Sequence, residues 1–259
     1  MEVHHHSHTS GLPGGKAGKK WRHYFWEFLM LFLAVFCGFL AEYQLEHQIE
    51  KDREKQFINN LLEDLQQDTT ALDQDVNEYQ AHLKRNDTLM RLLYGRDLKN
   101  HGDDLYYLAR RASRSVRLAL HDATYQQMKH SGGFRLIRKQ KVSRAIVEYY
   151  NRMVFIEYLQ GIERSESDEY RKMATEIFHP AIFNSIVKAD NTIVRPGGNP
   201  PLLTYDEKIL LRLAGMVSYI TNTKLGLSKA EEEMKTAASE LIVLIKKEYH
   251  LTKGTPLEE

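Results

Sequence analysis

A single apolar segment near the N-terminus constrains this chain more than any other feature of its sequence. Residues Phe28 to Ala41 read FLMLFLAVFCGFLA and include no charged side chain. The wider segment from Trp21 to Tyr43 has aromatic residues at both ends, and as a helix it is about 34 Å long at about 1.5 Å per residue. A bilayer has a hydrocarbon core of about 30 Å, and Trp and Tyr favour its two interfaces. The segment therefore predicts a transmembrane anchor.

Other interpretations of this segment stay open but fit less well. A cleavable signal peptide needs small residues at the first and third positions before the cut, and cleavage after Ala41 places the large Phe39 at the third. A lipoprotein signal needs a small residue before its cysteine, whereas Phe36 precedes Cys37. A buried helix of a soluble core is the remaining alternative. We favour an uncleaved anchor.

Basic residues around the segment predict its orientation. Those that lie shortly before Phe28 are Lys16, Lys19, Lys20 and Arg22, whereas the basic residues after Ala41 are interspersed with acids. Lys and Arg that flank an anchor tend to stay in the cytoplasm. We therefore expect a cytoplasmic N-terminus, with the bulk of the chain outside the cytoplasm.

The composition excludes several classes of function. Lys and Arg total 36 and Asp and Glu total 35, so the chain lacks the basic excess of a general nucleic-acid binder. Cys37 is the only cysteine, which excludes a disulfide framework, a zinc ribbon and CxxC redox motifs. The sequence also contains no HExxH, GxxxxGK[ST] or GxSxG motif. We therefore expect no enzymatic activity, no cofactor and no nucleic-acid partner.

Beyond the anchor, apolar residues repeat with the period of packed helices. From Ile58 they step alternately by four and three positions, the heptad spacing of a helical bundle or coiled coil. No Gly or Pro lies between Glu42 and Tyr94, so we expect the anchor to continue directly into this long helix. The positions of the stripe are 58, 62, 65, 69, 72, 76, 79 and 83, with Thr69 as its one weak member.

Further helices are expected over 105–120, 122–131, 136–178 and 205–250, with a loop over 190–204. Ser131-Gly132-Gly133 predicts the C-terminus of the short helix. Gly226, followed by Ser228 as a candidate cap, leaves open whether the last segment is one helix or two. The predicted fold is all-α, with an N-terminal transmembrane helix that continues into an up-and-down helical bundle with long helices.

The predicted organisation has four parts. These are a disordered His-rich cytoplasmic tail (1–20), a transmembrane anchor (21–43), an extracytoplasmic helical bundle (44–251) and a flexible C-terminus (252–259).

Two groups of residues are candidates for binding an anionic ligand. Arg110, Arg114 and Arg117 share one face of the expected helix 105–120, and guanidinium groups pair well with carboxylates and phosphates. Arg135 follows a glycine turn that precedes a helix N-terminus, where free N–H groups attract anions, and Tyr149 is near it in sequence. The alternatives are a plain connection between packed helices and, for the arginines, a solvated face paired with the acids Glu63, Asp64 and Asp68.

Other candidate residues lie near the N-terminus. Glu27, one turn inside the anchor, is either a proton relay or ion-pair partner, or a headgroup-level acid neutralised by Arg22 or His23. Gly38 shares a face with the small residues Ala34 and Ala41, which predicts close approach of two anchors. The tail residues that can chelate a divalent metal, or form a plain polar tail, are His4, His5, His6 and His8.

Two stretches of the sequence resemble a known family. The start MEVHHH, the KKW after it, and HYFWEFLMLFLAVFCGFLAE with LEH resemble uncharacterised membrane-anchored proteins of Bacteroidetes. More loosely, TYQQMKHSGGFRLI and AIVEYYN resemble a helix–Ser-Gly–helix element of the same family. The resemblance covers 1–47 and 122–152, and it implies a bacterial inner-membrane protein with a helical periplasmic domain and no established catalytic residues.

These observations favour a non-enzymatic, membrane-anchored protein-interaction or scaffolding module at the outer face of the inner membrane. Its expected partners are the lipid bilayer and either another protein or further copies of the chain. The alternative is a ligand-sensing periplasmic bundle that passes a signal to a partner protein.

Overall fold

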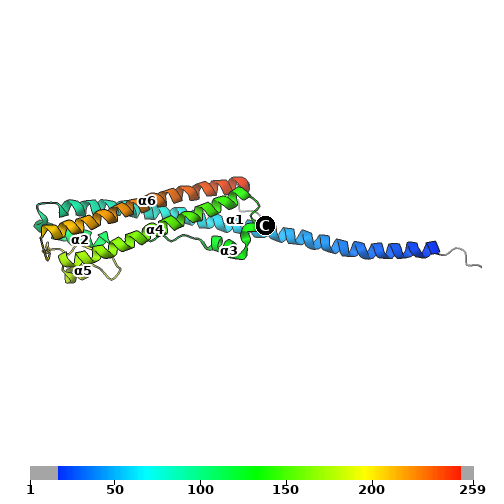
Figure 1. Ribbon diagram of the computed structural model, residues 1–259, viewed down its shortest axis with the longest axis horizontal. Helices are drawn as coiled ribbons and strands as arrows, with labels where there is room; N and C mark the ends of the chain where they lie inside the picture. Colours follow the sequence, from blue (N-terminus) through cyan, green and yellow to red (C-terminus); the bar gives the residue numbers. More distant parts are fainter. Residues whose placement is uncertain (1–16, 252–259) are drawn as a thin grey trace, which may run out of the picture. The chain divides into compact units, whose positions relative to one another are not determined.

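The computed structural model describes residues 17–251, which are mostly helical and confirm the predicted all-α fold (Figure 1). The β-structure of these residues is limited to one isolated bridge between Val187 and Ile193. The helices are α1 (Ala17–Leu93), α2 (Gly102–Ala112), α3 (Ala123–Ser131), α4 (Gln140–Ile177), α5 (Pro180–Ser185) and α6 (Glu207–Glu248), with 3-10 turns η1 (Leu98–Asn100) and η2 (Gly133–Leu136).

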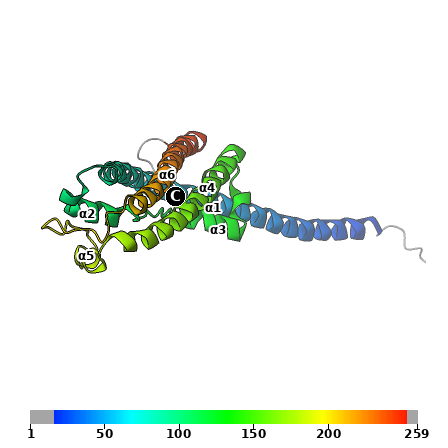
Figure 2. The ribbon, with the colours of Figure 1, turned by 60° about the vertical axis from the view of Figure 1, so that its left-hand side comes forward.

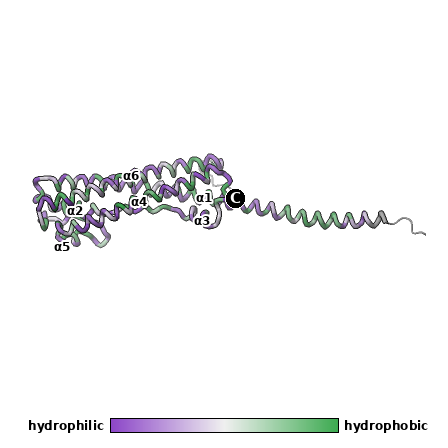
Figure 3. The backbone as a smooth tube through the Cα atoms, in the orientation of Figure 1, coloured by the Kyte–Doolittle hydropathy of each residue, from purple (hydrophilic) through white to green (hydrophobic). Residues whose placement is uncertain are grey.

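The chain divides into two compact units between Arg53 and Glu54. In the first unit, α1 begins at Ala17, inside the predicted tail 1–20, because Ala and Lys favour helix here. This part of α1 is long and apolar enough to cross a membrane, and no residue of its most apolar window is buried. Phe28 is 64% exposed and Phe39 67% exposed, and Figure 3 shows the apolar stretch along the helix. A large exposed apolar surface marks a site of membrane or protein contact.

The second unit is an up-and-down bundle (Figures 1 and 2). Gln80 of α1 bonds Ser228 of α6, whereas Asn86, further along α1, bonds Thr221, which lies earlier in α6. The two helices therefore run antiparallel. The remaining two positions of the bundle are filled by α4 and by the stretch from α2 to α3.

The stretch from α2 to α3 is broken, which corrects the predicted helix 105–120. The helix α2 ends at Ala112, and residues 114–122 form an irregular extended segment before α3. Neighbouring side chains satisfy its backbone, because Arg171 Nη2 donates to the Ser113 carbonyl at 2.8 Å and Asp68 Oδ1 accepts from the His121 N–H at 2.7 Å. Such side-chain bonds compete with a helical ladder, and they replace it here.

The structure decides whether the last helical segment is one helix or two, and it adds a short helix. The last helix, α6, runs unbroken through Gly226, so the alternative of two helices is wrong. A Cβ on Gly226 would lie 3.8 Å from Leu159 Cδ1, an ordinary packing distance, and Ser228 accepts a bond from Gln80 instead of capping a new start. The short helix α5 was not predicted, and Pro180 begins it at a position where the missing N–H of proline costs nothing.

The bundle has two apolar cores rather than one. The first core is centred on Leu65, Tyr79 and Ile146, and the second on Leu89, Tyr170 and Leu213. On α1, the predicted stripe positions 58, 62, 65, 72 and 79 are buried, whereas 69, 76 and 83 are only half-buried. The polar residues Asp68, His82 and Asn86 are buried on α1 in addition. Polar side chains therefore enter the interior within the first core, at Asp68, and where the first core meets the second, at His82 and Asn86.

Candidate functional site

A layer of buried polar side chains separates the two apolar cores. Each of three long helices contributes to it between a residue of one core and a residue of the other, as on α4, where Glu163 and Ser167 lie between Ile156 and Tyr170. We call these residues the polar layer. The members that lie between the two cores are His82 of α1, Glu163 and Ser167 of α4, and Lys224 of α6. Two further members, Tyr79 of α1 and Glu231 of α6, lie beyond them among residues of the first core, and all six are at most 3% exposed.

Lys224 connects three parts of the bundle. Its Nζ lies 3.3 Å from Glu163 Oε1 and 3.3 Å from His82 Nδ1, and it donates to the carbonyl of Arg114 in the extended segment. Burial lowers the pKa of Lys224, while the Glu163 carboxylate opposes that shift. The lysine therefore neutralises one buried acid and also supports the backbone of the element that lacks a helical ladder.

His82 is neutral in this environment. Burial lowers the pKa of His82 to about 3, and the Lys224 ammonium adds to the effect. Its Nε2 lies 3.3 Å from Glu78 Oε1, which also accepts from Arg85 Nη2 at 2.7 Å. A neutral ring with its proton on Nε2 donates to Glu78 and accepts from Lys224, so this tautomer satisfies both contacts. The histidine thus links the buried lysine to charges at the rim of the bundle.

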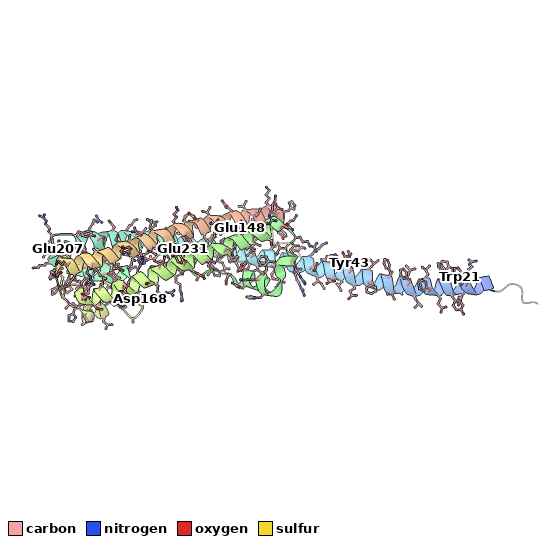
Figure 4. All side chains as sticks on the ribbon, in the orientation of Figure 1. Trp21, Tyr43, Glu148, Asp168, Glu207 and Glu231 are labelled. Atoms are coloured by element: carbon pink, nitrogen blue, oxygen red, sulfur yellow. The ribbon has the colours of Figure 1, made fainter. Side chains whose placement is uncertain are left out.

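Glu231 is a buried acid of the polar layer that no cation among the described residues contacts closely. It is 0% exposed, its Oε1 accepts from the Tyr79 hydroxyl at 3.4 Å, and its Oε2 has no hydrogen-bond partner. Burial raises the pKa of Glu231 to about 8, with a further contribution from the Asp75 and Glu163 carboxylates. Figure 4 shows Glu231 part-way along α6 within the bundle. An acid in such surroundings favours its neutral form at a pH where an exposed glutamate is ionised.

A second buried acid, Asp68, fixes the end of the extended segment. It is 0% exposed and accepts from the Tyr149 hydroxyl at 2.8 Å and from the His121 N–H at 2.7 Å. Nearby, Asp64 Oδ2 accepts from the Thr124 N–H at 3.2 Å. Burial raises the pKa of Asp68, and these hydrogen bonds oppose the shift. Both acids therefore bond backbone groups of the α3 side, not the arginines that sequence analysis offered as their alternative partners.

The three arginines that were predicted to share one face lie in different surroundings. Because α2 ends at Ala112, Arg110, Arg114 and Arg117 do not share one helix. Arg110 lies over the Phe183 ring at 5.6 Å, and Arg114 Nη2 donates to Asn191 Oδ1 at 2.8 Å. Arg117 is exposed on the extended segment. The predicted shared helix face is therefore wrong, and anion binding by these arginines stays a prediction.

The second predicted pair, Arg135 and Tyr149, also differs in burial. Arg135 is exposed in η2, whereas Tyr149 is buried against Asp68. Tyr149 also borders a cleft of about 290 Å³ between α4 and α6. The charged residues of that cleft are Glu148, Arg152 and Glu240, two carboxylates and one guanidinium, which does not favour an anion.

The remaining predicted residues lie near the N-terminus. Glu27 and Gly38 are exposed on α1, and a Cβ added to Gly38 would meet nothing within 4 Å. Gly38 therefore leaves room for another helix to approach. The candidate metal ligands His4, His5, His6 and His8 lie outside the described residues. Within residues 17–251, no group of three or more His, Cys, Asp or Glu side chains is arranged to hold a metal ion.

Comparisons of the chain with protein-family models, with curated proteins and with solved structures found no match.

The polar layer was not predicted, although the sequence contains a signal for it. Glu163 lies seven residues after Ile156 and seven before Tyr170, an inward spacing on a helix. Lys224 and Glu231 stand in the same relation to one another on α6. Charged residues at inward positions are rarely buried without partners, so they indicate a polar contact inside the bundle.

Proposed function

We propose that this protein is a non-enzymatic, membrane-anchored interaction module. Its α1 anchor crosses the bacterial inner membrane with the N-terminus in the cytoplasm, and its bundle lies in the periplasm. There, two copies associate side by side through the outward face of α4. The basic residues before Phe28 support this orientation, and the outward face of α4 is the observation that supports the association.

That face repeats an uncharged pattern on the side of α4 opposite the core. The steps alternate between four and three, so the positions form one stripe along the helix. Val154 and Tyr158 are 67% and 64% exposed, and Phe155 flanks them at 56%. The members of this outer stripe are Val147, Asn151, Val154, Tyr158, Gly161 and Ser165, all exposed.

A second copy of the chain fits this stripe better than an unrelated partner does. We propose that the two α4 helices run parallel and are related by a two-fold axis along their length. A heptad stripe is self-complementary in that arrangement, because each position meets its own counterpart. Asn151 would then pair with Asn151 of the second copy, a contact that fixes register in parallel helix pairs.

The size of the face explains why a tether is useful. The stripe is about 27 Å long at about 1.5 Å per residue. One helix face of that length buries less surface than a stable soluble complex does, which buries about 800 Å² on each partner. Confinement to one membrane raises the effective concentration of the two copies and makes a small interface sufficient. The anchor face with Ala34, Gly38 and Ala41 would add contact in the bilayer.

Disulfide cross-linking of the full chain in lipid vesicles tests this proposal. In a Cys37→Ser background, Val154→Cys should form dimers rapidly on mild oxidation, because symmetric positions of the stripe come within disulfide reach. The matched control is Val243→Cys on α6, since Val243 is 66% exposed and lies outside the stripe. Adding Tyr158→Glu should slow the Val154→Cys reaction. Equal rates at Val154→Cys and Val243→Cys would overturn the pairing through α4.

The predicted membrane orientation needs a separate measurement. A cysteine introduced at Lys247, near the end of α6, should react with a membrane-impermeant maleimide added outside intact inner-membrane spheroplasts, again in the Cys37→Ser background. Labelling only after the membrane is permeabilised would contradict the periplasmic placement of the bundle.

A sensing bundle remains the second candidate function, and the polar layer is the observation that favours it. Purely structural cores seldom bury charged groups that lack a full set of partners. Under this alternative, a change in the polar layer would alter pairing through α4.

A further inference from the structure

We infer that the polar layer is a proton-binding site, in which Glu231 takes up and releases a proton inside the folded bundle and so controls how tightly α6 packs on α1 and α4. This inference does not depend on self-association, because every residue that carries it lies within one chain.

The charges of the layer do not balance when both acids are ionised. Glu163 and Glu231 are 1% and 0% exposed, and among the described residues Lys224 is the only buried lysine or arginine. One cation therefore faces two carboxylates in the interior. An uncompensated buried charge costs several kcal/mol, so a group in that position binds a proton instead.

The contacts assign the proton to Glu231. Lys224 Nζ lies 3.3 Å from Glu163 Oε1, so the one buried cation is paired with that carboxyl group. Glu231 receives only the long 3.4 Å bond from Tyr79, and its free Oε2 is the natural place for a proton.

Charged groups on the elements around Glu231 reinforce that assignment. From α1 come the Asp75 carboxylate and the Tyr79 hydroxyl, and from α4 comes the Glu163 carboxylate. On α6 itself, Lys235 is engaged by Asp73 and Glu232. The arginines of the extended segment are directed elsewhere, because Arg114 bonds Asn191 and Arg117 is exposed. Burial and the two carboxylates therefore favour the neutral form of Glu231, and the Tyr79 hydrogen bond opposes them without cancelling their effect.

The sign of the pH dependence follows from this geometry. The pKa of Glu231 is raised from 4.5 to about 8 in the folded chain. The folded state thus binds this proton more tightly than the unfolded state does. The resulting stability is fully present below about pH 4.5, falls as the pH rises, and is lost above about pH 8. Ionised Glu231 has no cation to pair with, so separation of α6 from its neighbours becomes easier.

Urea unfolding of the full chain in detergent, followed by far-ultraviolet circular dichroism from about pH 5 to about pH 9, tests the inference. The folding equilibrium constant of the wild type should weaken by roughly a thousandfold from this group across the window. Glu231→Gln keeps the shape and removes the titration, so its stability should stay near the low-pH wild-type value and change less with pH. The control is Glu232→Gln, because Glu232 is its neighbour on the exposed side.

A second variant makes the test specific to the shared layer. Glu163→Gln removes the negative charge next to Glu231, so the pKa of Glu231 should fall. The stability of this variant should therefore stop decreasing at a lower pH than that of the wild type. The inference is overturned if Glu231→Gln keeps the wild-type slope. It is equally overturned if Glu231→Gln is already as unstable at pH 5 as the wild type is at pH 9, since the carboxyl proton would then contribute nothing.

Discussion

Replacing Lys224 by Met should destabilise the bundle more than any comparable change at its surface. Lys224 is 0% exposed, and its side chain neutralises Glu163 and donates to the Arg114 carbonyl. Breaking a buried ion pair by removing one partner costs about 3–5 kcal/mol. A buried carbonyl left without its donor adds about 1–3 kcal/mol. Because relaxation of the extended segment will recover part of this, we expect a loss of about 4 kcal/mol in the free energy of unfolding.

The assay is urea unfolding of the full chain in detergent, followed by circular dichroism. Trp fluorescence would not report on the bundle, since both tryptophans, Trp21 and Trp26, lie in the anchor. The matched control is Lys235→Met, because Lys235 forms surface ion pairs with Asp73 and Glu232 that are worth about 1 kcal/mol or less. The double variant Lys224→Met with Glu163→Leu should recover much of the loss, because it leaves no lone buried charge.

The reasoning would be refuted if Lys224→Met cost no more than Lys235→Met. It would also fail if the double variant were as unstable as the sum of the two single variants, because the two residues would then act independently.

Two further predictions concern the side chains that support the broken element and the space around two glycines, one in α2 and one in α6. Asp68→Ala should cost about 2–4 kcal/mol, because it leaves the part-buried His121 N–H and the buried Tyr149 hydroxyl without an acceptor, whereas Tyr149→Phe should cost about 1 kcal/mol. Hydrogen exchange at the His121 amide should rise in the first variant far more than in the second. Gly102→Ala should destabilise, because a Cβ there would collide with the Pro200 carbonyl, while Gly215→Ala, with no atom within 4 Å, should stabilise α6 by about 0.5–1 kcal/mol. Thermal unfolding would contradict this packing if both alanines shifted the midpoint in the same direction.

Helical periodicity predicted the long helices because they pack along most of their length. Ile58, Leu65 and Leu72 of α1 are buried as their spacing requires, and α6 remains one helix through Gly226. Local sequence also placed α3 correctly, since Gly132 has the positive φ of 69° that a helix C-cap commonly uses.

The broken α2 could not be predicted in the same way. Arg110, Arg114 and Arg117 have helical spacing, and only contacts with α1, α4 and α6 decide that the chain leaves the helix after Ala112. Those contacts include the bond from Lys224 to the Arg114 carbonyl, a group that lies 110 residues away in sequence. The polar layer escaped prediction for the same reason, because His82, Glu163 and Lys224 meet only after three helices have packed.

The account depends above all on α1 remaining in the membrane as an uncleaved anchor. Alkaline carbonate extraction of membranes that contain the native chain, combined with the intact mass of the extracted polypeptide, tests this most directly. We predict that the chain stays in the membrane pellet and that its mass includes residues 21–43. Recovery of the chain in the supernatant, or a mass that begins after Ala41, would contradict the account.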